Sequence, residues 1–197
     1  MAEGASRWRY FRLGSLSHNV VTIDGRNQRA GCRVPITAFY ADARRAHARF
    51  DLTAAYAGQV SAASRGFALL DAHTVLVQDE LTGGENDVHA RWAMLTSATV
   101  ELDGATAILR LNGRALRVRA LAPVGARWQV ESAEPPTAVE TPNPGKILLT
   151  LHLGLPAKST ARIVVIFEPA EAEAWPVESV PLAAWSSEAA LPLERAK

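Results

Sequence analysis

The sequence predicts an all-β protein, an antiparallel β-sandwich or barrel with an irregular C-terminal tail, and we take the β-sandwich as the expected fold. Three observations lead to this fold class. About a dozen short β-branched or alternating stretches follow one another closely, turn signals such as Asp103-Gly104 and Asn112-Gly113 separate them, and no convincing helical pattern appears. We therefore expect a sandwich domain at residues 1–168, and an Ala-, Glu- and Pro-rich tail packed on it at residues 169–197.

The first predicted strands lie on either side of a polar corner. Residues 8–13 alternate, which predicts a strand with Trp8, Tyr10 and Arg12 on one face. The β-branched run at 20–23 predicts a second strand, which the Asp24-Gly25 turn ends. Residues 46–52 alternate most cleanly, so we expect Phe50 on a core face and His47 on a solvent face.

The rest of the chain is predicted to continue in the same way. Residues 66–70 and 74–81 are expected to form a hairpin buried on both faces, and the residues from 88 to 94 a strand with Trp92 toward the core. Further strands are predicted at 99–102, 106–111, 115–122, 127–132, 146–153 and 160–168, the last two being central. Arg117 and Arg119 are expected on a solvated face, and Trp128 in the core. In the tail, Trp175 and Trp185 are expected as anchors, with a short strand near 177–180.

Composition bears on which partners to expect and on whether a disulfide can stabilise the fold. The formal net charge of +1 gives no general electrostatic reason to expect nucleic acid or an anionic membrane. Cys32 is the only cysteine, so no intramolecular disulfide can form. No apolar run reaches the length of a membrane span, and no secretory signal is visible at the N-terminus, which leaves the compartment open.

The basic residues are mostly arginine, since Lys146, Lys158 and Lys197 are the only lysines. The planar guanidinium suits carboxylates and sulfates held at two points, as on an acidic polysaccharide. A general composition bias explains the same excess, because the chain is also rich in alanine.

The corner itself carries the most specific pattern in the chain. His18-Asn19 is followed by Val-Thr-Ile-Asp-Gly and then by Gln28. This order resembles the His-Asn-Thr, hydrophobic, Val-Asp-Gly, x, x, Gln motif in the β-sheet domain of heparinase II/III-like polysaccharide lyases, with Val20 where the family usually has threonine. Looser similarity extends through residues 50–53 with Tyr56, 65–67 and 77–80.

The resemblance implies that the chain is the C-terminal β-domain, a supersandwich-like β-sandwich, of a lyase that cleaves an acidic, uronate-containing polysaccharide by elimination. In such lyases an α/α-toroid supplies most of the catalytic tyrosine, histidine and asparagine, so the β-domain alone is expected to be inactive. His18 would match a histidine that ligates zinc in the full-length enzyme, the other ligands preceding residue 1, and no cofactor is expected in this chain. The family is typically periplasmic or secreted; this chain would be cytoplasmic unless exported.

Other interpretations remain open for each candidate residue. Tyr10 is a candidate catalytic base or a packing aromatic. Trp8, Tyr10 and Arg12 together are candidates for stacking on sugar rings and pairing with uronate carboxylates. His18 is either a zinc ligand or a residue that hydrogen-bonds to backbone at the corner. The whole chain is alternatively a non-catalytic carbohydrate-binding sandwich, or a structural module. Expected partners are therefore an acidic polysaccharide and a toroid domain or partner chain that covers an open sheet edge.

Overall fold

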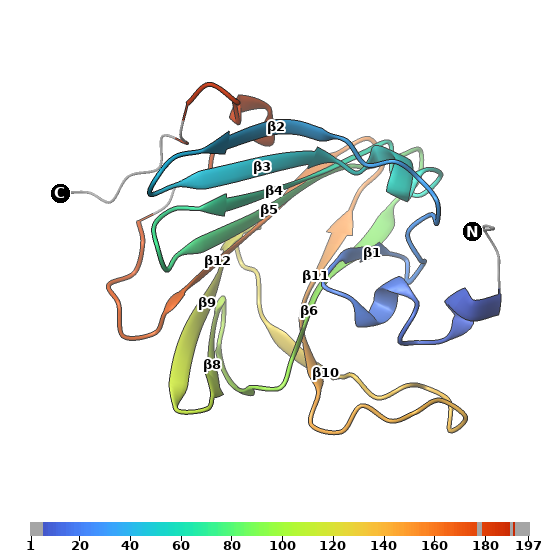
Figure 1. Ribbon diagram of the computed structural model, residues 1–197. Coiled ribbons are helices and arrows are strands. Elements are labelled where there is room, and N and C mark those ends of the chain that lie inside the picture. Colours follow the sequence, from blue (N-terminus) through green and yellow to red (C-terminus); the bar gives the residue numbers. More distant parts are fainter. Residues whose placement is uncertain (1–5, 177–178, 190, 192–197) are drawn as a thin grey trace.

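Two antiparallel sheets make up the computed structural model, which describes residues 6–176, 179–189 and 191 (Figure 1). One sheet has the order β1-β6-β11-β10 and the other the order β2-β3-β4-β5-β12-β9-β8-β7. The predicted all-β sandwich is confirmed. The strands are β1 (Val21–Ile23), β2 (Ile36–Ala41), β3 (Ala46–Asp51), β4 (Ala62–Leu69), β5 (Val75–Thr82), β6 (Val88–Thr96), β7 (Thr99–Asp103), β8 (Thr106–Leu111), β9 (Arg114–Ala122), β10 (Gln129–Ser132), β11 (Ile147–Leu155) and β12 (Thr160–Pro169).

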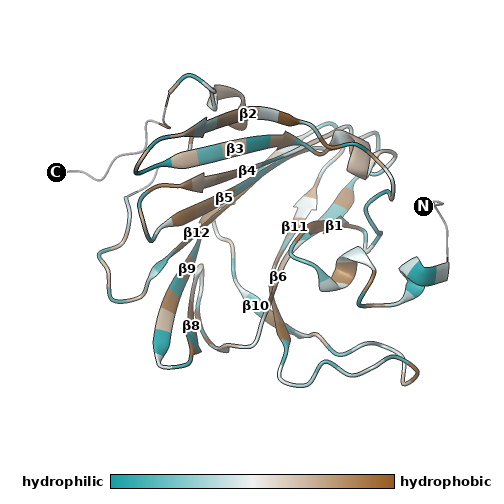
Figure 2. Ribbon diagram, in the orientation of Figure 1, coloured by the Kyte–Doolittle hydropathy of each residue, from teal (hydrophilic) through white to brown (hydrophobic). Residues whose placement is uncertain are grey.

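The main core fills the space between the two sheets. Trp92 of β6 and Trp128 are both buried and make an edge-to-face contact at 5.6 Å, as expected for two core aromatics. β12 lies between β5 and β9, and its residues from Ile163 to Ile166 are buried on both faces. Figure 2 shows that apolar residues are also frequent on β4 and β5. None of the helices formed by the described residues is long and apolar enough to span a membrane.

The N-terminal segment differs from the prediction. Residues 8–13 do not form a strand, because the chain makes a 3-10 helix, η1 (Ser6–Arg9), and then tight turns closed by the Tyr10 carbonyl, which accepts from the amides of Leu13 and Gly14. Neither face of the supposed strand is apolar enough to be buried. Instead, Phe11 alone packs on Ala93, Ala133 and Leu148. The segment therefore lies against the four-stranded sheet, on the side away from the main core.

The C-terminal segment crosses the outer face of the eight-stranded sheet. Trp175, the 3-10 helix η4 (Leu182–Ala184), Trp185 and Leu191 are packed on Leu76, Val164 and Ile166 in a second apolar cluster. Gly66 permits this contact, because a Cβ there would lie 2.6 Å from the ring of Trp185. Residues 177 and 178 of the expected strand near 177–180 lie outside the described residues, and Ser179 and Val180 are not in a strand.

The tail overturns the predicted faces of β3. His47, expected in solvent, is buried at 3% exposure; its Nε2 donates to the Ser186 carbonyl at 2.7 Å, and its ring meets Trp185 at 5.5 Å. On the inner face, Phe50 is only half-buried. The expected orientation of β3 is wrong. The tail covers the face that carries His47, and the four-stranded sheet does not cover this part of the face that carries Phe50.

The predicted solvated face of β9 is also wrong. The carboxylate of Glu168, on β12, is fully buried and accepts from Nε of Arg117 at 2.9 Å, Nε of Arg119 at 2.7 Å and the amide of Trp175 at 2.8 Å. The same arginines donate to carbonyls of Ala170, Ala172 and Trp175. These two side chains therefore bind the tail to the sheet.

Candidate functional site at the His18 corner

His18 and Asn19 form the corner at which the chain leaves the N-terminal segment and enters edge strand β1. The short 3-10 helix η2 (Ser15–Ser17) precedes them, and the His18 amide closes it by donating to the Ser15 carbonyl at 3.1 Å. The amide of Val20 then donates to the His18 carbonyl at 2.9 Å. The corner is thus a sharp, hydrogen-bonded reversal at the sheet edge.

Three other polar side chains of the corner motif make hydrogen bonds within the fold. Oδ1 of Asn19 accepts from the amide of Leu95 at 2.8 Å, and Oδ1 of Asp24 accepts from the amide of His89 at 2.8 Å. Asp24 and Gly25 have φ values of 49° and 68°, left-handed conformations that suit these two residue types and turn the chain after β1. Nε2 of Gln28 donates to the Tyr56 hydroxyl at 2.9 Å.

Two buried side chains, one from a short 3-10 helix and one from the eight-stranded sheet, hydrogen-bond to the backbone of the corner and of β1. The hydroxyl of Tyr56, from the 3-10 helix η3 (Thr53–Tyr56), donates to the Val21 carbonyl at 2.6 Å; burial raises the pKa of Tyr56, so the phenol keeps its proton. Arg65 on β4 donates from Nη1 to the Asn19 carbonyl at 2.8 Å and pairs with Asp79 on β5. Only the loose family similarity at these positions could have indicated this from the sequence.

His18 differs from Asn19, Asp24 and Gln28 of the same motif. Its side chain is exposed, and its imidazole makes no hydrogen bond with any residue that the structure describes. The alternative in which the ring bonds backbone at the corner is therefore not seen, since the backbone groups of His18 make those bonds. An exposed imidazole on a rigidly held corner is free to contact a ligand as a base, a hydrogen-bond donor or a metal ligand.

The family model described as "Heparinase II/III-like, C-terminal" matches residues 2–170 of the chain. The chain belongs to this family. Comparison with curated protein sequences gives no match.

Solved structures that are similar in fold to the heparinase II/III-like domain include several enzymes of greater length. A heparinase III with methylated lysines is 14% identical with a TM-score of 0.65, over 87% of this chain and 26% of its own. A mutant of the heparan sulfate lyase HepC from Pedobacter heparinus is 12% identical with a TM-score of 0.64, over 88% and 28% of the two chains. Another heparinase III is 16% identical with a TM-score of 0.63, over 84% and 25%. The heparinase II/III-like domain thus spans about a quarter of the length of these enzymes.

The described residues do not by themselves make a zinc site. Zinc needs three or four donors in a tetrahedral shell. Within residues 6–176, 179–189 and 191, no group of three His, Cys, Asp or Glu side chains converges suitably, so His18 supplies at most one ligand.

A second polar cluster in the heparinase II/III-like domain lies on the outer face of the four-stranded sheet. Oε1 of Glu131 is 2.6 Å from Nε2 of His152, whose Nδ1 is 3.2 Å from Nε2 of His89. The spacing of these histidines along the chain does not indicate that they meet; the pairing of β6 with β11 brings them into contact. Arg91 binds Oε2 of Glu131 from Nε at 2.9 Å, and its Nη1 donates to the Leu16 carbonyl at 3.3 Å, beside the corner.

The carboxyl group of Glu131, at the centre of this cluster, is favoured in its ionised form. Desolvation alone would raise the pKa of Glu131, but hydrogen bonds from Arg91, His152 and Thr150 outweigh it and hold the pKa below its ordinary value. The carboxylate accepts from Nε2 of His152, and when that ring is neutral its Nδ1 accepts from Nε2 of His89. The cluster orients two imidazoles, but within the part of the chain that the structure describes neither ring hydrogen-bonds to His18.

The three predicted sugar-contacting residues do not share a strand face. Trp8 lies half-buried in η1, where its carbonyl accepts from Nδ2 of Asn27 at 3.0 Å. Tyr10 is 51% exposed in the following turn. Arg12 is exposed and donates from Nη2 to the Pro142 carbonyl at 2.5 Å. Their roles toward a sugar stay predictions, without the common face on which the sequence argument relied.

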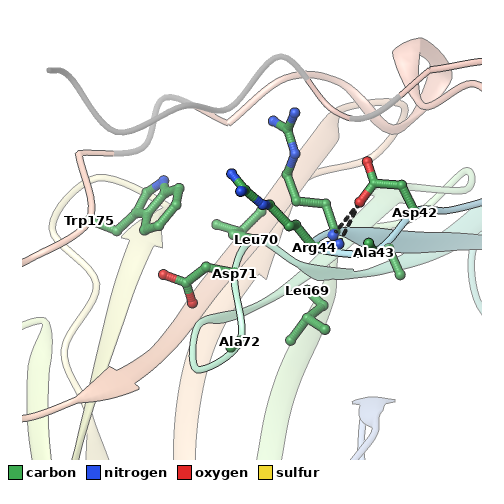
Figure 3. Close-up of a pocket in the computed structure, with 10 residues that line it drawn as sticks. Asp42, Ala43, Arg44, Leu69, Leu70, Asp71, Ala72 and Trp175 are labelled. Carbon is green, nitrogen blue, oxygen red and sulfur yellow. Dashed lines mark hydrogen bonds between the residues drawn. The ribbon is translucent and has the colours of Figure 1, made fainter.

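The pocket drawn in Figure 3 lies elsewhere, at the tips of the β2–β3 and β4–β5 hairpins. Its volume is about 710 Å³, and its lining combines Leu69 and Leu70 with Arg44, Asp71 and Trp175. Because Arg65 of β4, and not this end of the strand, contacts the corner, the pocket is not part of the His18 site.

Proposed function

We propose that this domain forms one wall of the active site of a lyase that cleaves an acidic polysaccharide by elimination, and that His18 faces the substrate there. One observation carries this proposal. His18 is exposed and unbonded among the described residues, whereas Asn19, Asp24 and Gln28 of the same motif are all bonded into the fold. These three side chains are held by hydrogen bonds, and the exposed imidazole of His18 is left to contact a ligand.

The chemistry requires more groups than this domain offers. Elimination from a uronate needs a partner that neutralises the carboxylate, a base that takes the proton beside it, and an acid that protonates the leaving oxygen. The exposed imidazole of His18 can serve as one of these, and Tyr10 stays a candidate for another. We infer that the remaining groups, and the other ligands of any zinc ion that His18 binds, belong to a helical domain of the longer enzyme.

An apolar surface offers a place for such a domain. On the inner face of β2 and β4, beyond the four-stranded sheet, Ile36 and Phe39 are 60% and 59% exposed, and Phe67 and Leu69 are 41% and 39% exposed. Phe67 lies next to Arg65, the residue that reaches the His18 corner, with the guanidinium 5.8 Å from its ring. A domain that covers this surface would therefore border the corner.

The first test measures cleavage and binding by the chain itself. We expect no unsaturated uronate product, seen as a rise in ultraviolet absorbance, from heparan sulfate, heparin or alginate. We expect His18→Ala to weaken binding of at least one of these polymers several-fold while changing the free energy of unfolding by no more than about 0.5 kcal/mol. His73→Ala, at another exposed histidine, is the control. Product formation by this chain, or equal binding by the two variants, would contradict the proposal.

A second candidate function, binding of anionic carbohydrate without catalysis, is favoured by the hairpin-tip pocket. Both oxygens of Asp42 accept hydrogen bonds, Oδ1 from the amides of Arg44 and Arg45 and Oδ2 from Tyr40. The side chain of Arg44 is exposed and has no hydrogen-bond partner in the described part of the chain. A guanidinium above an apolar floor suits a sugar ring with a carboxylate or sulfate group.

This alternative predicts which arginine matters for binding. Arg44→Gln should reduce affinity for sulfated or uronate oligosaccharides several-fold, measured by calorimetric titration, because it removes the pocket's exposed cation. Arg12→Ala tests the N-terminal surface in the same assay, and Arg127→Gln, at an exposed arginine away from both, is the control. Unchanged affinity in Arg44→Gln would remove the pocket from consideration.

A further inference from the structure

A buried ion pair lies directly beneath the His18 corner. Arg65 and Asp79 have side chains that are 9% and 3% exposed. Nε of Arg65 donates to Oδ1 of Asp79 at 2.7 Å, and Nη2 donates to Oδ2 at 2.9 Å. The two residues are direct cross-strand partners on β4 and β5, near the middle of the eight-stranded sheet.

The two-point pairing orients the guanidinium and leaves Nη1 available for a third contact. A bidentate pair fixes the plane of the guanidinium, because both parallel N–H bonds must meet the carboxylate. Nη1 is then directed at the Asn19 carbonyl, which it meets at 2.8 Å. The carbonyl belongs to the residue after His18, so a side chain anchored in one sheet holds the backbone that leads into the other.

The cost of such a pair makes a purely stabilising role a poor explanation. Burying two charges removes their hydration, and the free energy lost is only partly offset by their mutual attraction. Apolar residues of similar volume often stabilise a folded protein as well or better. A guanidinium fork nevertheless does what an apolar side chain cannot, since it fixes the direction of a hydrogen bond to a chosen carbonyl. The Tyr56 hydroxyl adds a second contact two residues further along, at the Val21 carbonyl.

We propose that Arg65, oriented by Asp79, is a positioning residue that fixes the backbone of the His18 corner and thereby the place of the His18 imidazole. The proposal rests on the proposed function of His18, but its geometry can be tested without a substrate. Two amides of β6 report on the corner directly. Ala93 donates to the Val20 carbonyl at 3.2 Å, and Leu95 donates to the Asn19 side chain at 2.8 Å.

The decisive variant is Arg65→Lys in this chain. Lysine keeps the positive charge beside Asp79 but cannot make a bidentate pair and a third directed bond together. We expect hydrogen exchange of the Ala93 and Leu95 amides to become about tenfold faster or more, the ratio expected for loss of one charge-assisted hydrogen bond, while amides of the β5–β12 ladder change less. The side-chain NMR signals of His18 should shift in the same variant.

The matched control is Arg162→Lys. Arg162 also lies on a central strand of the eight-stranded sheet and donates from Nε to Glu80 at 3.0 Å, but it faces the tail and not the corner. This variant should leave exchange at Ala93 and Leu95 and the His18 signals unchanged. If Arg65→Lys does not fold, Asp79→Asn gives the same test, since it loosens the fork without changing its shape.

Three outcomes would overturn the positioning role. They are unchanged exchange at Ala93 and Leu95, a uniform increase at all amides, and unmoved His18 signals. None of them bears on the proposed function, which instead fails if His18→Ala leaves polysaccharide binding intact. The two inferences therefore stand or fall on separate measurements.

Discussion

Replacing Asp79 with alanine should lower the free energy of unfolding by about 3 to 5 kcal/mol, one of the largest losses expected for a single substitution in this chain. The reason is that Arg65 would keep its charge in a site where its side chain is 9% exposed, and the Asn19 carbonyl would be its one remaining hydrogen-bond acceptor among the described residues. Unfolding in urea, followed by the near-ultraviolet signal of the buried tryptophans, measures the loss.

Glu101→Ala is the control for that experiment. Glu101 also pairs with an arginine across neighbouring strands, at 3.1 Å from Arg110, but their side chains are 66% and 55% exposed. Exposed pairs contribute little, so we expect a change within about 0.5 kcal/mol. Similar losses in the two variants would mean that burial of the Arg65–Asp79 pair has no special weight.

Replacing Glu168 with glutamine should cost about 2 to 4 kcal/mol, because two arginines lose the carboxylate that neutralises them. We place the loss below the full range for buried pairs because Arg117 and Arg119 keep 17% and 21% of their side-chain surface in solvent. The tail should also loosen, since the Trp175 amide donates to the same carboxylate. Thermal unfolding measures the stability, and tryptophan fluorescence reports the tail.

The effect of Glu168 should depend on pH in a defined direction. Desolvation alone would raise the pKa of Glu168, but hydrogen bonds from Trp175, Arg119 and Arg117 outweigh it, so the pKa in the folded protein lies below the ordinary value of 4.5. A carboxylate with a lowered pKa contributes its full stability above the ordinary value and loses it as the pH falls through the folded-state pKa. Wild type and Glu168→Gln should therefore differ most near neutral pH and converge in acid; a constant difference would contradict this assignment.

Local patterns in the sequence were sufficient for the fold class and for several turns. Asn112 and Gly113 have the positive φ values of 51° and 75° that this dipeptide predicts for a two-residue hairpin turn, and Asp24-Gly25 turns the chain in the same way. Trp92 and Trp128 lie in the core as expected. These features depend on residues close in sequence, so the amino-acid order contains the information that they need.

Assignments of faces failed wherever a distant segment covers a strand. His47 and Arg117 alternate with apolar neighbours, which suggested solvent, but the tail more than 50 residues further along lies over both. The strand expected at residues 8–13 failed for a related reason, because alternation alone cannot form a strand without an apolar face to bury. For the candidate site, the motif located the corner, but no local pattern indicates the Arg65–Asp79 pair beneath it or the contact of His89 with His152.

By itself, then, the sequence determined that this chain is an antiparallel sandwich with a family motif at one corner. Turn-forming residues and β-branched runs determine structure over a few neighbouring residues, so both can be recognised in the sequence. Only the tertiary structure decided which motif residue stays exposed, which buried charges hold it, and which sheet face the tail covers. Each of those outcomes depends on strand register and on contacts between segments 40 or more residues apart, for which no local pattern carries a signal.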